Sequence, residues 1–304
     1  MRRYAYYEGA GLGTRVRNAV RSTFHLAPLE RWLQHHVEGK PGSSFWNKLV
    51  PPEHTYPKGS WRTVDRYGVH LKLDISNAND HHAYFAPEQA SDDLLFGLVQ
   101  PEHTVIDIGG NIGIYAMQFA KLAYRGRVIT FEPDPVNFAR LQEHSAMNQA
   151  SNVTAVRMGI GAKAATHRLY QVVPTNSGMN RMITQGEVDP DVPFTEIRVE
   201  PLDAAIAGMN VTRVDVLKMD VEGFEDEALR GAEATVRRYK PVLFVEVNDE
   251  NLIDNGSSAR TLIDRIRSWG YRVYRVPGRE PLLPEVDLRG CVMDVLCLPD
   301  EAAR

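Results

Sequence analysis

One stretch constrains the fold of this chain more than any other. Residues 104–116 read TVIDIGGNIGIYA. A short apolar run is broken by Gly109, Gly110 and Gly113, and residues 112–124 then show the apolar spacing of an amphipathic helix. The pattern predicts a strand, a tight glycine turn and a helix whose first amide groups face a ligand, as in nucleotide-binding sheets.

The charge of this turn narrows the choice of ligand. A dinucleotide pattern G-x-G-x-x-G ending at Gly113 would need glycine at position 108, where the chain has Ile108, and Asp107 would repel a pyrophosphate. A cofactor with an ammonium group and a positive sulfonium suits an acidic turn better, which points to S-adenosylmethionine. Glu132 follows Gly113 by about the 20-residue interval expected for an acid that binds a ribose.

Composition sets outer bounds on the class of protein. The chain has 304 residues, of which 43% are hydrophobic and 24% charged, with a net charge of −4. It can therefore form one large domain with an appendage, and the overall charge gives no indication of a nucleic-acid partner. No apolar run approaches a membrane span or a secretory signal, so we expect a cytoplasmic protein. Cys291 and Cys297 lie six residues apart on one predicted strand, about 20 Å, and are expected to be free thiols.

The first 40 residues differ in charge from the rest, with seven Lys or Arg against three Glu. Apolar residues recur at helical spacing and predict two short amphipathic helices: Leu12, Val16, Val20 and Phe24, then Leu29, Trp32, Leu33 and Val37. We expect these helices to pack on the main domain or on a second subunit, giving a homo-oligomer. The alternative is docking on an anionic membrane surface or an acidic partner. Residues 1–62 are predicted to form a helical extension and linker, and residues 63–304 the main domain.

The segment before the glycine turn has three predicted features. Residues 63–75 alternate as a hairpin that turns at Tyr67 and Gly68. Asp80, His81, His82 and Tyr84 are expected on an extended segment, where adjacent histidines point to opposite faces and form no two-ligand metal site. His82 is kept as a candidate base, with His81 in reserve. Residues 91–99 are expected to form a helix that covers one end of the cofactor.

After the glycine turn, strands and helices alternate to the C-terminus. Strands are predicted at 127–132, 153–158, 214–219 and 242–247, and helices at 135–149, 225–239 and 258–269. This order indicates an α/β fold with a doubly wound, mostly parallel sheet covered on both faces. The last strands, 271–276 and 292–298, are joined by a loop with three prolines and no helix. The final strand is therefore predicted to insert antiparallel to its neighbours.

Five motifs together resemble the FkbM-type family of S-adenosylmethionine-dependent methyltransferases. They are TVIDIGGNIGIYA, VITFEPDPVNFARL, the NSG at 176–178, LKMDVEGFEDEALRGA and PVLFVEVND, and the resemblance covers roughly residues 70–250. The family usually has alanine where this chain has Gly110. The resemblance implies a Rossmann-like class I methyltransferase fold and methylation of hydroxyl groups on sugars, glycans or polyketide-type natural products.

The resemblance also implies a set of cofactor-binding residues. Asp107 and the turn from Gly109 to Gly113 would hold the methionine end, and the Asn111 side chain would meet the methionine carboxylate. Glu132 would accept both ribose hydroxyls. Phe131, Pro133 and Met158 are candidates to flank the adenine, with core packing as the alternative for each.

A polar stretch at 174–194 follows the third predicted strand, at the sheet edge where open α/β folds bind ligands. Unstructured loops of this length are uncommon in compact domains unless they are functional or disordered. We interpret it as a lid over the acceptor, and the alternative is a surface loop without a role. The candidate lid residues are Asn176, Ser177, Asn180 and Arg181.

Acidic residues end the fourth and fifth predicted strands. Asp220 and Glu222 follow the first of these, and Glu246 lies near the end of the second. Since neighbouring parallel strands run about 4.8 Å apart, these carboxylates are expected to meet. Close acids raise one another's pKa, which creates a general base or calls for a cation such as Mg²⁺, held by Asp220 and Glu246. The alternatives are that Glu222 caps the next helix and that Glu246 pairs with Lys218 or an arginine.

Three functions compete on this sequence. The first is methyl transfer to a hydroxyl of a small-molecule or glycan acceptor. An NAD-dependent oxidoreductase is disfavoured by Ile108 and by the lack of a Tyr-x-x-x-Lys pair to protonate a carbonyl. A non-catalytic adaptor that binds the cofactor or a partner is the third.

Overall fold

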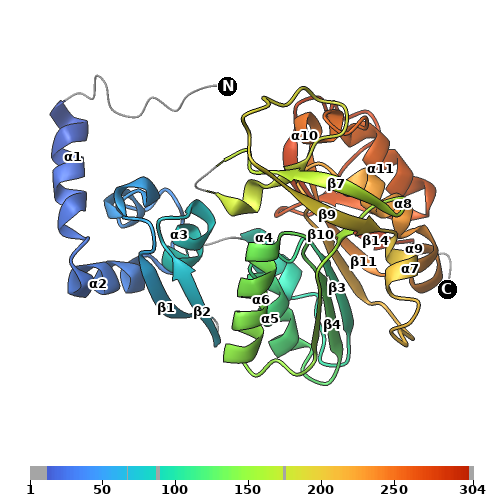
Figure 1. Ribbon diagram of the computed structural model, residues 1–304, viewed down its shortest axis with the longest axis horizontal. Coiled ribbons are helices and arrows are strands. Elements are labelled where there is room, and N and C mark those ends of the chain that lie inside the picture. The colour runs from blue at the N-terminus through green and yellow to red at the C-terminus, as the bar shows by residue number, and fades with distance from the viewer. Residues whose placement is uncertain (1–11, 67, 87–89, 174–175, 301–304) are drawn as a thin grey trace. The chain divides into compact units, whose positions relative to one another are not determined.

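The computed structural model describes residues 12–66, 68–86, 90–173 and 176–300. The chain forms two compact units (Figure 1). The smaller unit consists of Met1–Val64 and Lys72–Gln89, and the larger unit of Asp65–Leu71 and Ala90–Arg304. The smaller unit therefore continues beyond the boundary expected after residue 62, because residues 72–89 belong to it. Helix α3 (Ala78–Phe85) contacts helix α2 (Ala27–Val37) within this unit.

The larger unit is built on an eight-stranded sheet with the order β13-β12-β14-β11-β10-β3-β4-β5. Strands β5, β4, β3, β10 and β11 run parallel, and β14 inserts antiparallel between β11 and β12. The predicted doubly wound sheet and its antiparallel last strand are both confirmed. The strands are β3 (Thr104–Ile108), β4 (Arg127–Phe131), β5 (Val153–Val156), β10 (Val216–Met219), β11 (Val242–Asn248), β12 (Tyr271–Arg275), β13 (Glu280–Pro281) and β14 (Val292–Pro299).

Helices cover both faces of this sheet (Figure 1). One face carries α4 (Ala90–Phe96), α5 (Ile114–Leu122) and α6 (Pro135–Met147), and the other carries α8 (Glu225–Gly231), α9 (Glu233–Tyr239) and α11 (Ala259–Ser268). The predicted single helix at 225–239 is two helices. The break lies at Ala232, where the Asp203 carboxylate accepts hydrogen bonds from the amides of Ala234 and Thr235 and so caps a new helix start.

A second, four-stranded sheet was not predicted. It has the order β6-β9-β7-β8 and consists of β6 (Gly159–Ile160), β7 (Ala165–Tyr170), β8 (Arg181–Met182) and β9 (Phe194–Glu200). Ile197 and Val199 of β9 are buried and alternate with exposed residues, as expected for a strand with one covered face. The predicted loop at 174–194 is therefore partly ordered by β8 and by the short helix η3 (Ser177–Met179).

The smaller unit begins with the two predicted helices, α1 (Leu12–Thr23) and α2. The side chains of Leu12 and Val16 lie outside the described set. Short 3₁₀ helices follow at η1 (Asn47–Leu49) and η2 (Glu53–Thr55). The expectation of an extended segment around His81 and His82 is wrong, because both lie on α3, which begins where the Asn77 side chain accepts from the amides of Asn79 and Asp80.

The predicted hairpin is present as β1 (Trp61–Arg66) and β2 (Val69–Asp74), and Tyr67 in its turn lies outside the described residues. Its tip, residues 65–71, belongs to the larger unit. There Gln118 of α5 donates to the Arg66 carbonyl at 2.9 Å. Asn148 exchanges two hydrogen bonds with the backbone of His70, each 2.7 Å long. The tip is therefore hydrogen-bonded to α5 and to the end of α6.

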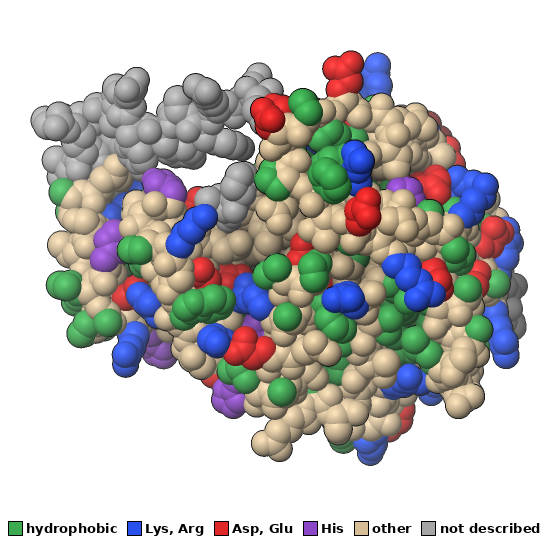
Figure 2. All heavy atoms as spheres, viewed as in Figure 1, with side chains coloured by type: hydrophobic (Ala, Val, Ile, Leu, Met, Phe, Trp, Pro, Cys, Tyr) green, Lys and Arg blue, Asp and Glu red, His purple; other side chains and the backbone are tan. Residues whose placement is uncertain are grey.

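Charged side chains of both signs are mixed on the visible surface (Figure 2). On the face shown in Figure 2, the described Lys and Arg side chains alternate with Asp and Glu instead of gathering in one basic area. Within the described ranges, no helix has both the length and the apolar character needed to cross a membrane. Cys291 and Cys297 are free thiols, as predicted.

Candidate active site

The glycine turn after β3 is packed against the end of β10. Gly109 has φ +87°, and a Cβ built on it would lie 1.8 Å from the carbonyl oxygen of Asp220. The amides of Gly109 and Gly110 both donate to the Phe131 carbonyl, at 3.0 and 2.9 Å. Only glycine allows both this approach and this backbone conformation. Gly113, with φ +90°, then starts α5. The turn predicted from the sequence is present.

Asp107 lies beneath this turn and is fully buried. Its Oδ2 accepts a hydrogen bond from the Thr130 hydroxyl at 3.0 Å, whereas its Oδ1 is buried without a hydrogen-bond partner. Lys218 Nζ lies 3.8 Å from that oxygen. Burial raises the pKa of Asp107 above its ordinary value, and the Lys218 charge opposes this shift. Asp107 is thus tied to the protein, and its direct contact with a methionine end stays a prediction.

Glu132 follows the next strand and joins the turn from the other side. One carboxylate oxygen accepts from the Asn111 amide at 2.7 Å and the other from the Asp134 amide at 2.8 Å. Glu132 is 6% exposed, and burial raises its pKa to about 7. Asn111 has φ +48°, and its side-chain oxygen is buried without a hydrogen-bond partner. The structure therefore brings these two predicted cofactor residues together.

Two of the three apolar candidates for the adenine, Phe131 and Met158, differ in burial. Phe131 is fully buried in the main core, which agrees with the alternative of core packing, and its carbonyl accepts from the glycine turn; its contact with adenine stays a prediction. Met158 follows β5, is partly buried and packs against the edge of the same core. It stays a candidate.

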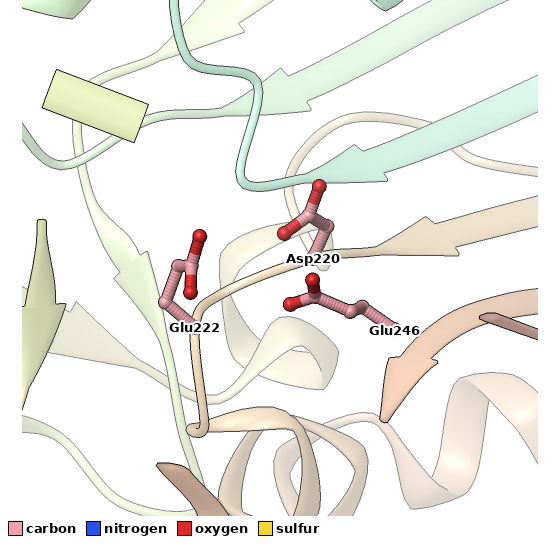
Figure 3. A group of neighbouring side chains, drawn as sticks. All are labelled: Asp220, Glu222 and Glu246. Carbon is pink, nitrogen blue, oxygen red and sulfur yellow. The ribbon is translucent and has the colours of Figure 1, made fainter. Parts of the chain in front are cut away.

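Three carboxylates meet at the ends of β10 and β11 (Figure 3). Each of Asp220, Glu222 and Glu246 offers one oxygen, and these oxygens lie within 4.8 Å of one another. The two strands are parallel neighbours, with Met219 opposite Val245, as the sequence argument required. The predicted carboxylate cluster, defined as these three residues, is therefore formed.

Burial and mutual repulsion govern the protonation of this cluster. Burial, followed by the charge of Asp220, raises the pKa of both Glu222 and Glu246 well above their ordinary value. Lys218 Nζ lies 3.2 Å from Asp220 Oδ2. Burial alone would lower the pKa of Lys218, but Asp220 and Asp107 raise it, so this lysine stays charged. The cluster thus combines one paired carboxylate with two that hold protons more tightly than usual.

Among the described residues, neither alternative role for the glutamates has a hydrogen bond or ion pair to support it. Phe224 is the N-cap of α8, and the Glu225 carboxylate accepts from the amides of Val221 and Gly223, so Glu222 is not the cap. Glu222 instead has φ +54°, an unusual conformation for a residue with a side chain. Glu246 has one oxygen that is buried without a hydrogen-bond partner, and the ion pairs of Lys218 go to Asp107 and Asp220.

The candidate lid residues dock on two helices at this edge of the sheet. Asn180 donates to Asp134 Oδ2 at 3.2 Å, and the Ser177 carbonyl accepts from Asn137 of α6. Asn176 accepts from the Gly178 amide and shapes η3. Arg181 pairs with Asp254, which follows α10 (Asp249–Ile253). Three of the four residues therefore tie the segment to α6 and to the end of α10, and contact with an acceptor stays a prediction.

Sequence reasoning missed Tyr115 and Asp92, which form a hydrogen-bonded pair beside Lys218. The Tyr115 hydroxyl donates to Asp92 at 2.6 Å, and Lys218 Nζ lies 4.6 Å from the centre of the Tyr115 ring. Tyr115 stands in the first turn of α5, directly after the glycine turn, and that position was the available signal. His82 belongs to the smaller unit, and its role as a base stays a prediction.

Comparison with known proteins identifies the family. The Methyltransferase FkbM domain matches residues 107–273, more than half of the chain. A "Methyltransferase 1" of Beauveria bassiana is 28% identical over 142 residues, which are 42% of this chain and 57% of that protein. "Hexuronic acid methyltransferase AglP" of Haloferax volcanii is 27% identical over 45% of this chain and 53% of its own length. "31-O-demethyl-FK506 methyltransferase FkbM" of Streptomyces tacrolimicus is 27% identical over 62% of this chain and 80% of its own.

The chain thus spans just over half the length of two of these relatives. The matched region begins at Asp107 and contains the glycine turn, Glu132 and the whole carboxylate cluster. Its strand order, with an antiparallel last strand, is the class I methyltransferase arrangement that the sequence predicted. The protein belongs to the FkbM methyltransferase family.

Proposed function

We propose that this protein transfers the methyl group of S-adenosylmethionine to a hydroxyl oxygen of a sugar, glycan or polyketide-type small molecule. The observation that carries the proposal is the carboxylate cluster beside the glycine turn, where Gly109 lies against the backbone of Asp220. A hydroxyl held there would lie next to groups that can take its proton. Relatives named for a hexuronic acid and for 31-O-demethyl-FK506 support a hydroxyl-bearing acceptor.

The donor set around the turn fits S-adenosylmethionine. Glu132 already accepts two backbone amides, but each carboxylate oxygen has a second lone pair for a ribose hydroxyl. The side-chain oxygen of Asn111 is buried without a partner, and a polar ligand at the turn would satisfy it. The acidic turn would also favour the positive sulfonium. Family membership removes the oxidoreductase alternative.

An alcohol is a poor nucleophile until it loses its proton, and the cluster offers a base for this step. The raised pKa values of Glu222 and Glu246 bring their proton affinity closer to that of a hydroxyl, which makes the ionised form a stronger base. Lys218 keeps a positive charge beside Asp220. We assign Asp220 the place next to the acceptor hydroxyl, with the two glutamates as the groups that receive or store the proton.

The same oxygens also fit a hard cation. Carboxylate oxygens within 4.8 Å of one another match the oxygen ligands that Mg²⁺ prefers, and Asp220 and Glu246 would hold the ion. Its positive charge would favour the ionised form of a neighbouring hydroxyl. Chelation separates the two mechanisms: activity lost in EDTA and restored by Mg²⁺ supports the ion, and full activity in EDTA supports a protein base.

The function is tested with S-adenosylmethionine that carries a labelled methyl group. The purified protein is incubated with cell extracts and with a panel of sugars and hydroxylated natural products. We expect label in a small molecule, as a methyl ether. Tight cofactor binding without any transfer of label would favour the adaptor alternative, and NADH bound at the turn in place of S-adenosylmethionine would overturn the cofactor assignment.

A further inference from the structure

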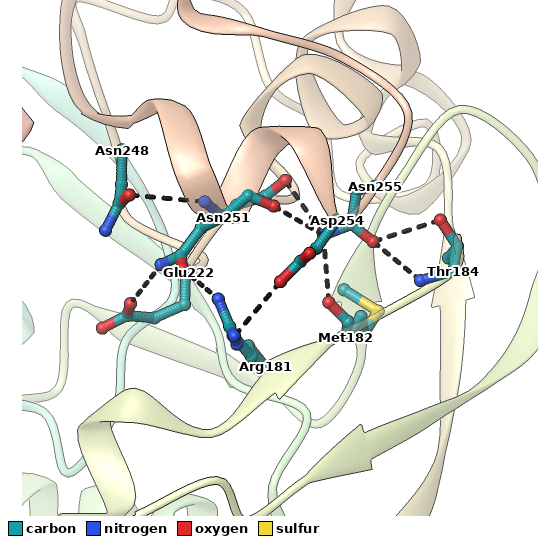
Figure 4. A network of polar contacts seen from close by, with 9 residues as sticks. Arg181, Met182, Thr184, Glu222, Asn248, Asn251, Asp254 and Asn255 are labelled. Atoms are coloured by element: carbon teal, nitrogen blue, oxygen red, sulfur yellow. Dashed lines mark hydrogen bonds and ion pairs between the residues drawn. The ribbon is translucent and has the colours of Figure 1, made fainter. Parts of the chain in front are cut away.

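The lid segment, defined as residues 176–192, is fastened to α10 by a network of polar contacts (Figure 4). The amides of Thr184, Gln185 and Gly186 all donate to the Asp254 carbonyl, at 3.3, 2.9 and 3.2 Å. Arg181 Nη2 lies 3.2 Å from the carboxylate of the same aspartate. One residue after α10 therefore binds both the backbone and a side chain of the lid segment.

Asn251 connects this network to the carboxylate cluster. Its side-chain oxygen accepts from Arg181 Nη1, and its Nδ2 donates to Glu222 Oε2 at 3.2 Å. An arginine can only donate, so Arg181 takes the amide oxygen and leaves Nδ2 for Glu222, which fixes which way the amide is turned. Asn251 is 8% exposed, and its backbone amide donates to the Asn248 side chain at 3.3 Å. Its side chain is thus held between the lid and Glu222.

Backbone packing holds the three parts together. A Cβ built on Gly223, the residue after Glu222, would lie 2.4 Å from the Asn251 carbonyl oxygen. Asn255 Nδ2 donates to the carbonyl of Gly223 at 3.2 Å and to that of Met182, in the lid segment, at 3.0 Å. The turn that carries Glu222 therefore shares hydrogen-bond partners with the lid segment.

We propose that Asn251 is a positioning residue that holds the Glu222 carboxylate in the cluster and, through Arg181, couples it to the seating of the lid segment. Hydrogen bonds to charged groups are stronger than neutral ones, and Asn251 accepts one from the charged Arg181 while it donates to Glu222. A change at the lid is transmitted to Glu222, and a change at Glu222 is transmitted to the lid. The catalytic part of this inference rests on the proposed function, whereas the physical coupling does not.

Hydrogen exchange of the amides of residues 184–186, followed by mass spectrometry, tests the coupling without any acceptor. Glu222→Ala should make these amides exchange about tenfold faster, because Asn251 loses one of its two partners. Glu246→Gln is the matched control: it alters the same cluster without touching Asn251 and should leave their exchange unchanged. Wild-type exchange in Glu222→Ala would overturn the proposal.

A double substitution tests whether Asn251 carries the effect. Asn251→Ala should speed exchange of the same amides, and adding Glu222→Ala should then produce no further change. Independent, additive effects of the two substitutions would contradict the coupling. Thermal unfolding of each variant identifies any loss of the whole fold, which would speed exchange throughout the chain and not in this segment alone.

Asn251→Asp separates the two contacts of Asn251. An aspartate keeps an oxygen for Arg181 but places a second negative charge opposite Glu222. We expect kcat for methyl transfer to fall about tenfold or more, with KM for S-adenosylmethionine little changed. Wild-type kcat would remove the positioning role and leave the proposed function standing. No label transfer by the wild type would remove the function and leave the exchange experiment valid.

Discussion

Buried acids in the two units of this protein have different surroundings. In the smaller unit, Glu30 is 1% exposed and accepts from Arg62 Nε at 2.5 Å and Nη2 at 3.0 Å, with the Tyr84 hydroxyl at 3.3 Å. In the larger unit, Glu222 and Glu246 face each other and Asp220. Glu246 has a buried oxygen with no hydrogen-bond partner.

The difference shows which acids the fold itself requires. A buried charge is tolerated when a cation and hydrogen bonds satisfy it, as they do at Glu30. At the carboxylate cluster, Lys218 pairs with Asp107 and Asp220, and the two glutamates have raised pKa values. Packing alone gives no reason to gather acids in this way, and perturbed groups at the end of a sheet are typical of a functional site.

The largest effect is expected from a change of Asp220, the cluster carboxylate that pairs with Lys218. Asp220→Asn should lower turnover by about 10²-fold or more, the scale of lost acid–base catalysis, while S-adenosylmethionine affinity changes by less than about tenfold. Turnover with the labelled cofactor and calorimetric titration measure the two quantities. Wild-type turnover in both this variant and Glu246→Gln would show that the cluster is not catalytic. The cluster acids would then have no functional difference from Glu30.

Removing Arg62, the cation that pairs with Glu30, should lower the stability of the protein instead of its turnover. Arg62→Met leaves Glu30 buried without its cation, and we expect the free energy of unfolding to fall by about 3 kcal/mol. Urea denaturation measures this loss. Arg237→Met is the matched control, since it breaks an exposed pair with Glu233 whose contribution should be below about 0.5 kcal/mol. Equal losses in the two variants would show that burial of Glu30 does not matter.

Glu132 is an intermediate case. It is buried and accepts from two backbone amides, and no ion pair to it is found in the part of the chain that the structure describes. Glu132→Ala should weaken S-adenosylmethionine binding by roughly 1.5 to 3 kcal/mol, the range for losing a charged hydrogen-bond partner. Calorimetry on the wild type and the variant gives this difference directly. Unchanged affinity would place Glu132 with the structural acids and remove its assignment to the ribose.

The smallest expected effect is a gain in stability. Burial and like charges raise the pKa of Glu246 in the folded protein above its ordinary 4.5, so the folded state binds more protons than the unfolded one. Its contribution to stability is therefore present below about pH 4.5 and is lost as the pH rises through the raised pKa. Glu246→Gln should be about 1 kcal/mol more stable than the wild type at pH 9 and differ less at pH 5, as measured by urea denaturation.

Much of the site could be predicted because parallel strands end at one edge. Alternation of strands and helices gave the sheet, and the placement of Asp220 and Glu246 at two strand ends then implied their meeting. The inward direction of Phe131 could not be derived, since a central strand is apolar on both faces. Asn251 contacts Glu222 although 29 residues separate them in the sequence, and no local sequence pattern predicts such a contact.

Other misses had a signal in the sequence. Asn77 three residues before Asp80 is a pattern that starts helices, and it outweighs the weak propensity of the two histidines that follow. The alternation of Ile197 and Val199 marks a strand, but β9 follows a polar stretch and pairs mainly with β7, about 30 residues earlier in the chain, so its partner was not apparent.

The hairpin tip at 65–71 has a consequence for how this protein can exchange parts with its relatives. The family match begins at residue 107, yet Gln118 and Asn148, inside it, hydrogen-bond to Arg66 and His70 outside it. A chimera joined directly before residue 107 would lose these partners and expose their polar groups. A crossover that keeps these hydrogen bonds has to lie before the hairpin. Because Arg62 of the hairpin pairs with the buried Glu30 of α2, the crossover has to lie before α2 as well.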